Sequence, residues 1–110
     1  MYARVARFEG NDPSLIDEQV AEMKRQMSAA RSGELPAETP EQARTLMDTV
    51  SRFMELVDRE SGTSLGIAFC ETEEDMRRAD EALNEMSPPE GGPRRTAVDI
   101  FEVVLDESFR

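Results

Sequence analysis

Three stretches of the chain space their hydrophobic residues as a helix does. The longest covers about residues 13–31 and follows Asp12, which is a good helix N-cap. A shorter helix is predicted over residues 40–48, where Thr39 begins a capping-box pattern. The third is predicted over residues 73–86, with Thr72 as its N-cap and carboxylates in its first turn. The apolar stripe of the longest helix consists of Ile16, Val20, Met23, Met27 and Ala30.

Four other stretches have the alternating or β-rich sequences of strands, at residues 2–9, 49–60, 65–70 and 96–105. The second and third flank a short link that contains glycine, which predicts a β-hairpin. Before the last strand, residues 87–93 are rich in proline and glycine, so we expect them to form a loop.

The order of the long elements is β-α-β-β-α-β, which is the ferredoxin-like, or split βαβ, arrangement. This order predicts a single α+β domain over residues 1–110. Four antiparallel strands would form one sheet, with the helices on one of its faces. The first and third strands would be central, and the second and fourth would be edges.

The last predicted strand is apolar on both of its faces. Val98 and Ile100 point to one face, whereas Ala97, Phe101 and Val103 point to the other. An antiparallel strand with one face in water normally alternates apolar and polar residues, so both faces are expected to be covered. The helices suffice for only one face. We therefore predict that the other face packs on an identical sheet, giving a twofold homodimer and a shared two-sheet barrel.

Charge and composition exclude several kinds of partner. The 110 residues include 24 acidic and 13 basic side chains, for a formal net charge of −11. Phosphate backbones and anionic lipid surfaces repel such a protein, so neither nucleic acid nor a membrane is an expected partner. The chain has no stretch long enough to span a bilayer, no signal-peptide pattern and only one cysteine, which together predict a cytoplasmic protein.

The absence of histidine restricts the chemistry further. Without it the chain cannot form a histidine-ligated zinc or haem site, or use an imidazole base. The acidic cluster from Glu71 to Asp75 lacks the spacing of a calcium loop and is explained by helix capping. No metal and no cofactor are therefore expected.

Two short motifs and the element order resemble a known family. Residues 56–66 read LVDRESGTSLG, which is similar to a "DR-x-TG" hairpin, and residues 68–75 read AFCETEED, which is similar to a "W-[DE]-[ST]-x-E" strand-to-helix passage. Together they resemble the dimeric α+β barrel superfamily, and within it the antibiotic biosynthesis monooxygenase-like domains. Cys70 stands where that family usually has tryptophan.

The resemblance implies a homodimer, and a cofactor-independent monooxygenase that acts on a small hydrophobic or aromatic substrate. The alternative is a non-enzymatic homodimeric module that binds a ligand or another protein. The alternative is motivated by the missing histidine and tryptophan, because relatives with known chemistry often use these residues.

Arg4 and Asp99 are the candidate catalytic residues. Both lie on strands that are expected to be neighbours, and charged groups among apolar strands need partners. An arginine there would bind an anionic or enolate oxygen, while a carboxylate would act as the base. The structural alternative is that both residues only form ion pairs or lie in solvent at strand ends.

Four further residues are candidates for binding a small hydrophobic ligand. Tyr2 would place a phenol at the mouth of a pocket, and Cys70 lies just before a helix N-terminus, where a thiol pKa is lowered unless carboxylates oppose it. Arg52 and Met54 lie on the second strand. Their structural alternatives are a solvated edge for Arg52, and likewise for Glu55 on the same strand, and core packing for Met54.

Overall fold

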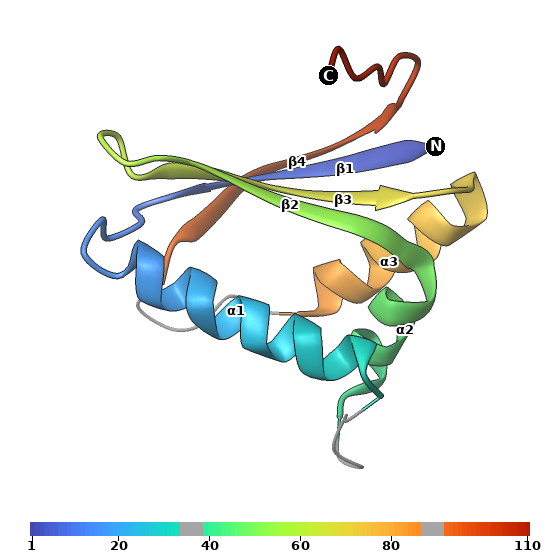
Figure 1. Ribbon diagram of the computed structural model, residues 1–110, viewed down its shortest axis with the longest axis horizontal. Coiled ribbons are helices and arrows are strands. Elements are labelled where there is room, and N and C mark those ends of the chain that lie inside the picture. Colours follow the sequence, from blue (N-terminus) through green and yellow to red (C-terminus); the bar gives the residue numbers. More distant parts are fainter. Residues whose placement is uncertain (34–38, 87–91) are drawn as a thin grey trace.

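The structure is a computed structural model, and it describes residues 1–33, 39–86 and 92–110. In these ranges four antiparallel strands form one sheet in the order β2-β3-β1-β4 (Figure 1). The predicted α+β class is confirmed, with β1 and β3 in the centre and β2 and β4 at the edges. The strands are β1 (Tyr2–Glu9), β2 (Val50–Asp58), β3 (Thr63–Cys70) and β4 (Arg94–Glu102).

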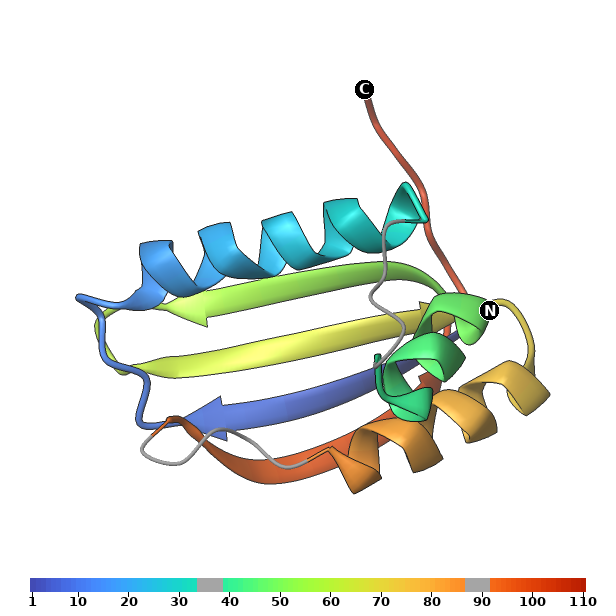
Figure 2. The same cartoon turned by 90° about the horizontal axis from the view of Figure 1, so that it is seen from below.

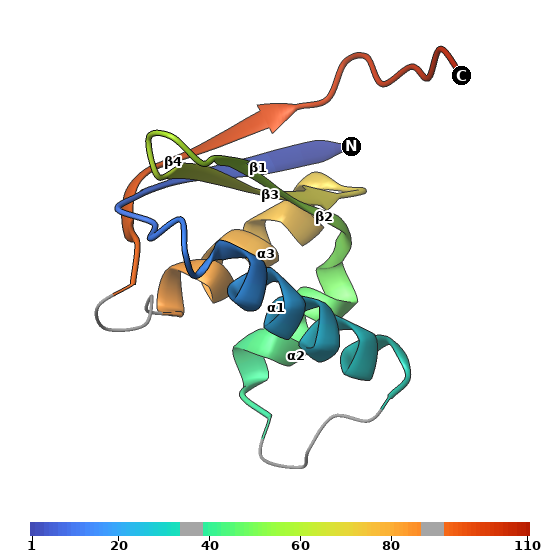
Figure 3. The same ribbon diagram turned by 60° about the vertical axis from the view of Figure 1, so that its left-hand side comes forward.

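All three helices of the described residues lie on the same face of the sheet (Figures 1 and 3). α1 runs beside β2, whereas α3 lies on the side of β1 and β4, and α2 packs against α3 (Figure 2). None of them covers the other face, which we call the open face. The helices are α1 (Ile16–Arg31), α2 (Glu41–Thr49) and α3 (Glu73–Glu85).

α3 begins at the N-cap that the sequence predicts. The Thr72 hydroxyl oxygen accepts a hydrogen bond from the Asp75 amide at 3.1 Å, which satisfies one free N–H of the first turn. The apolar stripe of α3 then turns toward the sheet, where Met76 and Ala79 bury Cys70. The small core is completed by Tyr2, Leu46 and Val50, which pack against this cluster.

α1 begins later than predicted because Asp12 caps a turn instead of the helix. Its carboxylate accepts hydrogen bonds from the Ser14 amide at 2.9 Å and the Ser14 hydroxyl at 2.7 Å. This local turn delays the helix to Ile16, with Leu15 at the N-cap. Ile16 is also the only buried residue of α1, so most of the predicted stripe remains partly exposed.

The other element ends differ by a few residues. α2 begins at Glu41 and its N-cap is Pro40, with no side-chain cap, so the predicted capping box is wrong. β3 begins two residues earlier than predicted, at Thr63, and β4 ends at Glu102 instead of residue 105. After the hydrogen bond from the Val103 amide to the Met1 carbonyl (2.9 Å), the chain leaves the sheet (Figure 3). Most of the predicted loop at residues 87–93 lies outside the described residues.

The β2–β3 hairpin closes on the turn after β1. Gly62 has a φ of 74°, and a Cβ at that position would lie 2.8 Å from the Asn11 carbonyl oxygen. The Asn11 backbone amide and side-chain amide both donate hydrogen bonds to the Gly62 carbonyl, at 3.0 and 2.8 Å. The close approach therefore requires glycine both for its positive φ and for the missing side chain.

Strand register divides the side chains between the two faces, because directly opposite residues point the same way. Arg4, Ala68 and Ile100 lie opposite one another, and Arg4 bonds to α3, so this row belongs to the helix-covered face. The adjacent rows belong to the open face. The apolar side chains of the open face are Ala3, Val5, Met54, Leu56, Leu65, Ile67, Phe69, Ala97 and Phe101.

Candidate functional site

Arg4 is a buried residue that joins the sheet to α3. Its side chain is 3% exposed, its Nε donates to the Asp80 carboxylate at 2.8 Å, and a terminal nitrogen donates to the Asn84 side-chain oxygen at 3.0 Å. These two acceptors satisfy the guanidinium within the protein. The arrangement matches the structural alternative, in which Arg4 holds β1 against α3.

The structure does not bring Arg4 and Asp99 together. Asp99 lies opposite Val5 on β1, one position along the ladder from Arg4, so the two side chains point to opposite faces of the sheet. Asp99 is exposed on the open face. The two residues therefore cannot act on the same substrate atom within one chain.

Tyr2 and Cys70 lie opposite each other on the helix-covered face. Cys70 is completely buried against α3, and burial raises the pKa of its thiol, with a smaller contribution in the same direction from the Asp75 carboxylate. The thiol is therefore held in its protonated, unreactive form. Tyr2 packs against it as part of the core.

Arg52 and Met54 belong to the open face of β2. The Arg52 guanidinium carbon lies 5.9 Å from the centre of the Phe69 ring, a cation–π contact across the β2–β3 pair. Met54 lies opposite Ile67 and is half-buried. Of the six candidate residues, these two and Asp99 share the open face, whereas Arg4, Tyr2 and Cys70 lie on the other.

Glu55 is a residue that the sequence pattern places on a solvated edge, and in the structure it is exposed with two aromatic rings on one side. It lies opposite Gly66 on the helix-covered face. A Cβ on Gly66 would lie 3.4 Å from a Glu55 carboxylate oxygen, 3.5 Å from the Phe53 ring and 3.8 Å from the Phe8 ring, so the three side chains converge over the glycine. The sequence alone does not show this convergence, because it depends on how β2 and β1 align with β3.

The environment of Glu55 changes its acidity. Burial raises the pKa of its carboxyl, and a hydrogen bond with Ser64 opposes part of that rise. A carboxyl with a raised pKa beside two aromatic rings is a better general base than a solvated one, and it can also be neutral in weak acid. Among the described residues, it is the carboxyl for which desolvation is the main cause of the pKa shift.

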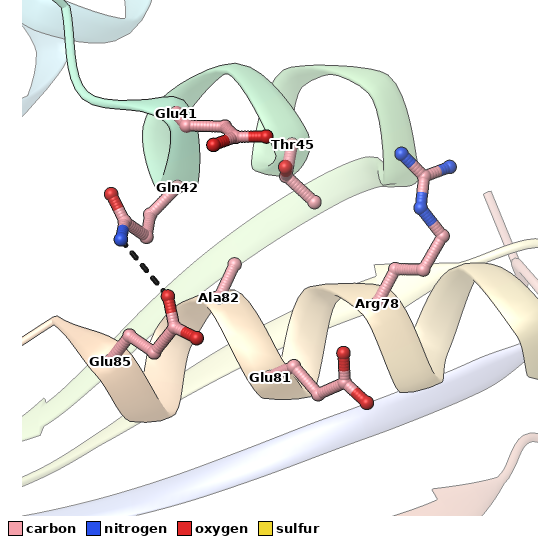
Figure 4. A pocket seen from close by; sticks show the side chains of 7 residues that line it. All are labelled: Glu41, Gln42, Thr45, Arg78, Glu81, Ala82 and Glu85. Atoms are coloured by element: carbon pink, nitrogen blue, oxygen red, sulfur yellow. Dashed lines mark hydrogen bonds between the residues drawn. The ribbon is translucent and has the colours of Figure 1, made fainter.

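A cleft of about 340 Å³ lies between α2 and α3, on the surface away from all six candidate residues. Figure 4 shows the side chains of both helices around it, with Arg78 at one end and a hydrogen bond from Gln42 to Glu85 (2.9 Å) at the other. Three glutamates make the cleft strongly polar. It is lined by Glu41, Gln42, Thr45, Arg78, Glu81, Ala82 and Glu85.

The described residues contain neither a cluster of metal ligands nor a helix that could span a membrane. Within the described ranges, no three His, Cys, Asp or Glu side chains converge in a way that could hold a metal ion. No helix in those ranges is long and apolar enough to cross a bilayer.

Comparison with known proteins adds no relative. Neither a protein-family model nor a curated protein sequence matches the chain. The features of this chain that indicate a function are therefore the open face, the Glu55 cluster and the sequence motifs described above.

Proposed function

We propose that this protein is a homodimeric module in which two copies pack through their open faces. The supporting observation is the apolar character of that face, which no helix of the described residues covers. Phe101 is 56% exposed and Leu56 is 43% exposed. Leu56 lies opposite the half-buried Leu65, and Phe101 lies opposite Ala3, which in turn lies opposite the half-buried Phe69. A contiguous apolar surface of this kind is rare on monomers and typical of an interface.

The fold that we propose for each subunit is the ferredoxin-like arrangement, with α2 as an addition, and for the pair the dimeric α+β barrel. The element order and the central positions of β1 and β3 support it. The chain after β4 supports it as well, because this segment carries the aromatic side chain of Phe109, which is 97% exposed in the single chain. In a dimer such a segment has a neighbouring subunit on which to pack.

The dimer predicts a specific mass in solution. Sedimentation equilibrium at micromolar concentration is expected to give twice the 12.4 kDa of one chain. Burying several large apolar side chains on each side provides the driving force, at about 1.5–3 kcal/mol for each fully buried side chain. A species of 12.4 kDa would contradict the proposal.

A specific observation also favours a second candidate function, the cofactor-independent monooxygenase. Glu55 would remove a proton from a substrate held against Phe8 and Phe53, and the resulting carbanion would react with O₂. The substrate itself supplies the electrons. One oxygen atom stays in the product and the other leaves as water. In this version Glu55 takes the role that the sequence suggested for Asp99.

Glu55→Gln tests the effect of burial on this carboxyl. Because burial raises the pKa of this carboxyl, its ionised form opposes folding above that pKa. Removing the charge is expected to raise the free energy of unfolding at pH 7, by about 0.5 kcal/mol or less because the side chain is partly exposed. The gain should disappear as the pH falls below the pKa that this carboxyl has in the unfolded chain, which is lower than its folded-state pKa, because glutamic acid is then neutral in both states. Urea unfolding at pH 7 and in acid measures this difference.

The same variant tests the enzyme. Oxygen uptake with aromatic ketones that carry an acidic CH₂ group should be lost in Glu55→Gln and retained in Glu60→Gln, a control in the exposed hairpin turn. Equal uptake by both variants would exclude Glu55 as the base. Absence of uptake by the unmodified protein across the panel would favour the non-enzymatic module.

A further inference from the structure

Two side chains of opposite charge, neither in an ion pair among the described residues, lie on opposite edges of the open face. They are Arg52 on β2 and Asp99 on β4. This face also carries Arg7, which lies on central β1 with Glu9 at 4.0 Å, and Arg94, which lies opposite Glu9 at the start of β4. A dimer formed through this face would remove Arg52 and Asp99 from water, and buried charges need partners.

Arg52 and Asp99 lie two residues apart along the direction of the strands. Arg52 is opposite Phe69, which is opposite Ala3, which is opposite Phe101. Asp99 is two residues from Phe101 along β4, a distance of about 7 Å. An arginine side chain can span such an offset between two sheets packed about 10 Å apart.

Two sheets can pack face to face with the twofold axis either along the strands or across them. An axis across the strands places β2 over the partner's β2 and β4 over the partner's β4, so that the edge with Arg52 faces an edge with arginine and the edge with Asp99 faces an edge with aspartate. An axis along the strands and over the middle of the sheet places β2 over the partner's β4. Only the second arrangement brings opposite charges together, and it does so twice.

We propose that the twofold axis runs along the strands and that Arg52 pairs with the partner subunit's Asp99. This inference rests on the dimer proposed above and specifies its orientation. The two symmetric ion pairs lie at the edges of the interface and flank the apolar centre. They determine which of the two face-to-face arrangements forms, because the other one would bury like charges.

Charge reversal tests the pairing. In Arg52→Asp the partner's Asp99 would face an aspartate, and in Asp99→Arg the partner's Arg52 would face an arginine. Each variant is therefore expected to weaken the dimer at least tenfold in Kd, measured by sedimentation equilibrium. The double variant R52D/D99R restores two opposite-charge pairs and should return Kd to within about tenfold of the unmodified protein. An axis across the strands predicts no loss in either single variant.

The control places the compensating arginine on the other face. R52D/E102R has the same composition of charges as R52D/D99R, but Glu102 lies opposite Tyr2 on the helix-covered face. It should remain as weak as R52D alone. Mixing the R52D and D99R single variants should also restore a dimer, because that heterodimer contains both opposite-charge pairs. Recovery on mixing shows in addition that each variant chain is folded.

The outcomes distinguish a failure of the Arg52–Asp99 ion pair from a failure of the proposed dimer. Single variants that dimerise as well as the unmodified protein, or a double variant weaker than both, would overturn the Arg52–Asp99 pairing while the dimer stands. An unmodified protein that sediments as a monomer would overturn the proposed dimer and the pairing with it.

Discussion

Phe101→Asp is expected to convert the dimer to a folded monomer. Phe101 is 56% exposed in the single chain, so it contributes little to the fold of that chain. In the dimer each subunit would bury this ring, and the replacement would instead bury an unpaired charge at two symmetric positions. Losing two buried aromatic side chains corresponds to an increase in Kd of at least about 100-fold. Sedimentation equilibrium measures Kd, and circular dichroism measures the fold.

Ala21→Asp is the matched control, because it adds the same charge at an exposed position of α1. Its Kd should equal that of the unmodified protein. If Phe101→Asp also leaves Kd unchanged, the open face is not the interface. The self-association would then have to involve another surface.

Asp80→Ala is expected to produce the largest loss of stability. The variant leaves the buried Arg4 guanidinium with only the Asn84 oxygen as a partner. An uncompensated buried charge costs about 3–5 kcal/mol, so the free energy of unfolding should fall by that order. Arg4→Met should cost less, because it leaves the charge on Asp80, which is partly exposed and can be hydrated. Urea unfolding at a fixed chain concentration measures both, since dimerisation also stabilises the fold.

An exposed ion pair provides the comparison. Arg59 and Asp17 lie 2.7 Å apart, and both side chains are more than half exposed. Arg59→Ala should lower the free energy of unfolding by less than about 1 kcal/mol. If Asp80→Ala costs no more than Arg59→Ala, Arg4 does not depend on Asp80 for its charge balance. The interpretation of this pair as the connection between β1 and α3 would then be wrong.

Local sequence patterns predicted the helix and strand boundaries correctly where a single residue type decides the local backbone geometry. Thr72 was predicted as the cap of α3, and its hydroxyl accepts the expected hydrogen bond. The alternation in residues 2–9 predicted β1 with its observed bounds. Asp12 was misplaced because an Asx turn and a helix N-cap use the same side chain, and the sequence does not show which backbone amide it will meet.

The candidate site could not be predicted in the same way. Arg4 and Asp99 were placed on adjacent strands, which is confirmed, but their pairing depended on register. A displacement of one residue between β1 and β4 would have put them on the same face. Glu55 was taken as solvated because β2 is an edge strand, and it is exposed in the structure. The sequence did not show that Phe8 lies nearby, because Phe8 and Gly66 are distant from Glu55 in the chain.

By itself the sequence determined the class of the fold, the order of its elements and an excess of apolar residues on β4, because these follow from local spacing and composition. Only the tertiary structure decided which face each charged residue occupies, that Arg4 is satisfied by α3, and that Arg52 and Asp99 share an uncovered face. The reason is that strand register and helix placement are set by contacts between residues far apart in the chain. No local pattern contains those contacts.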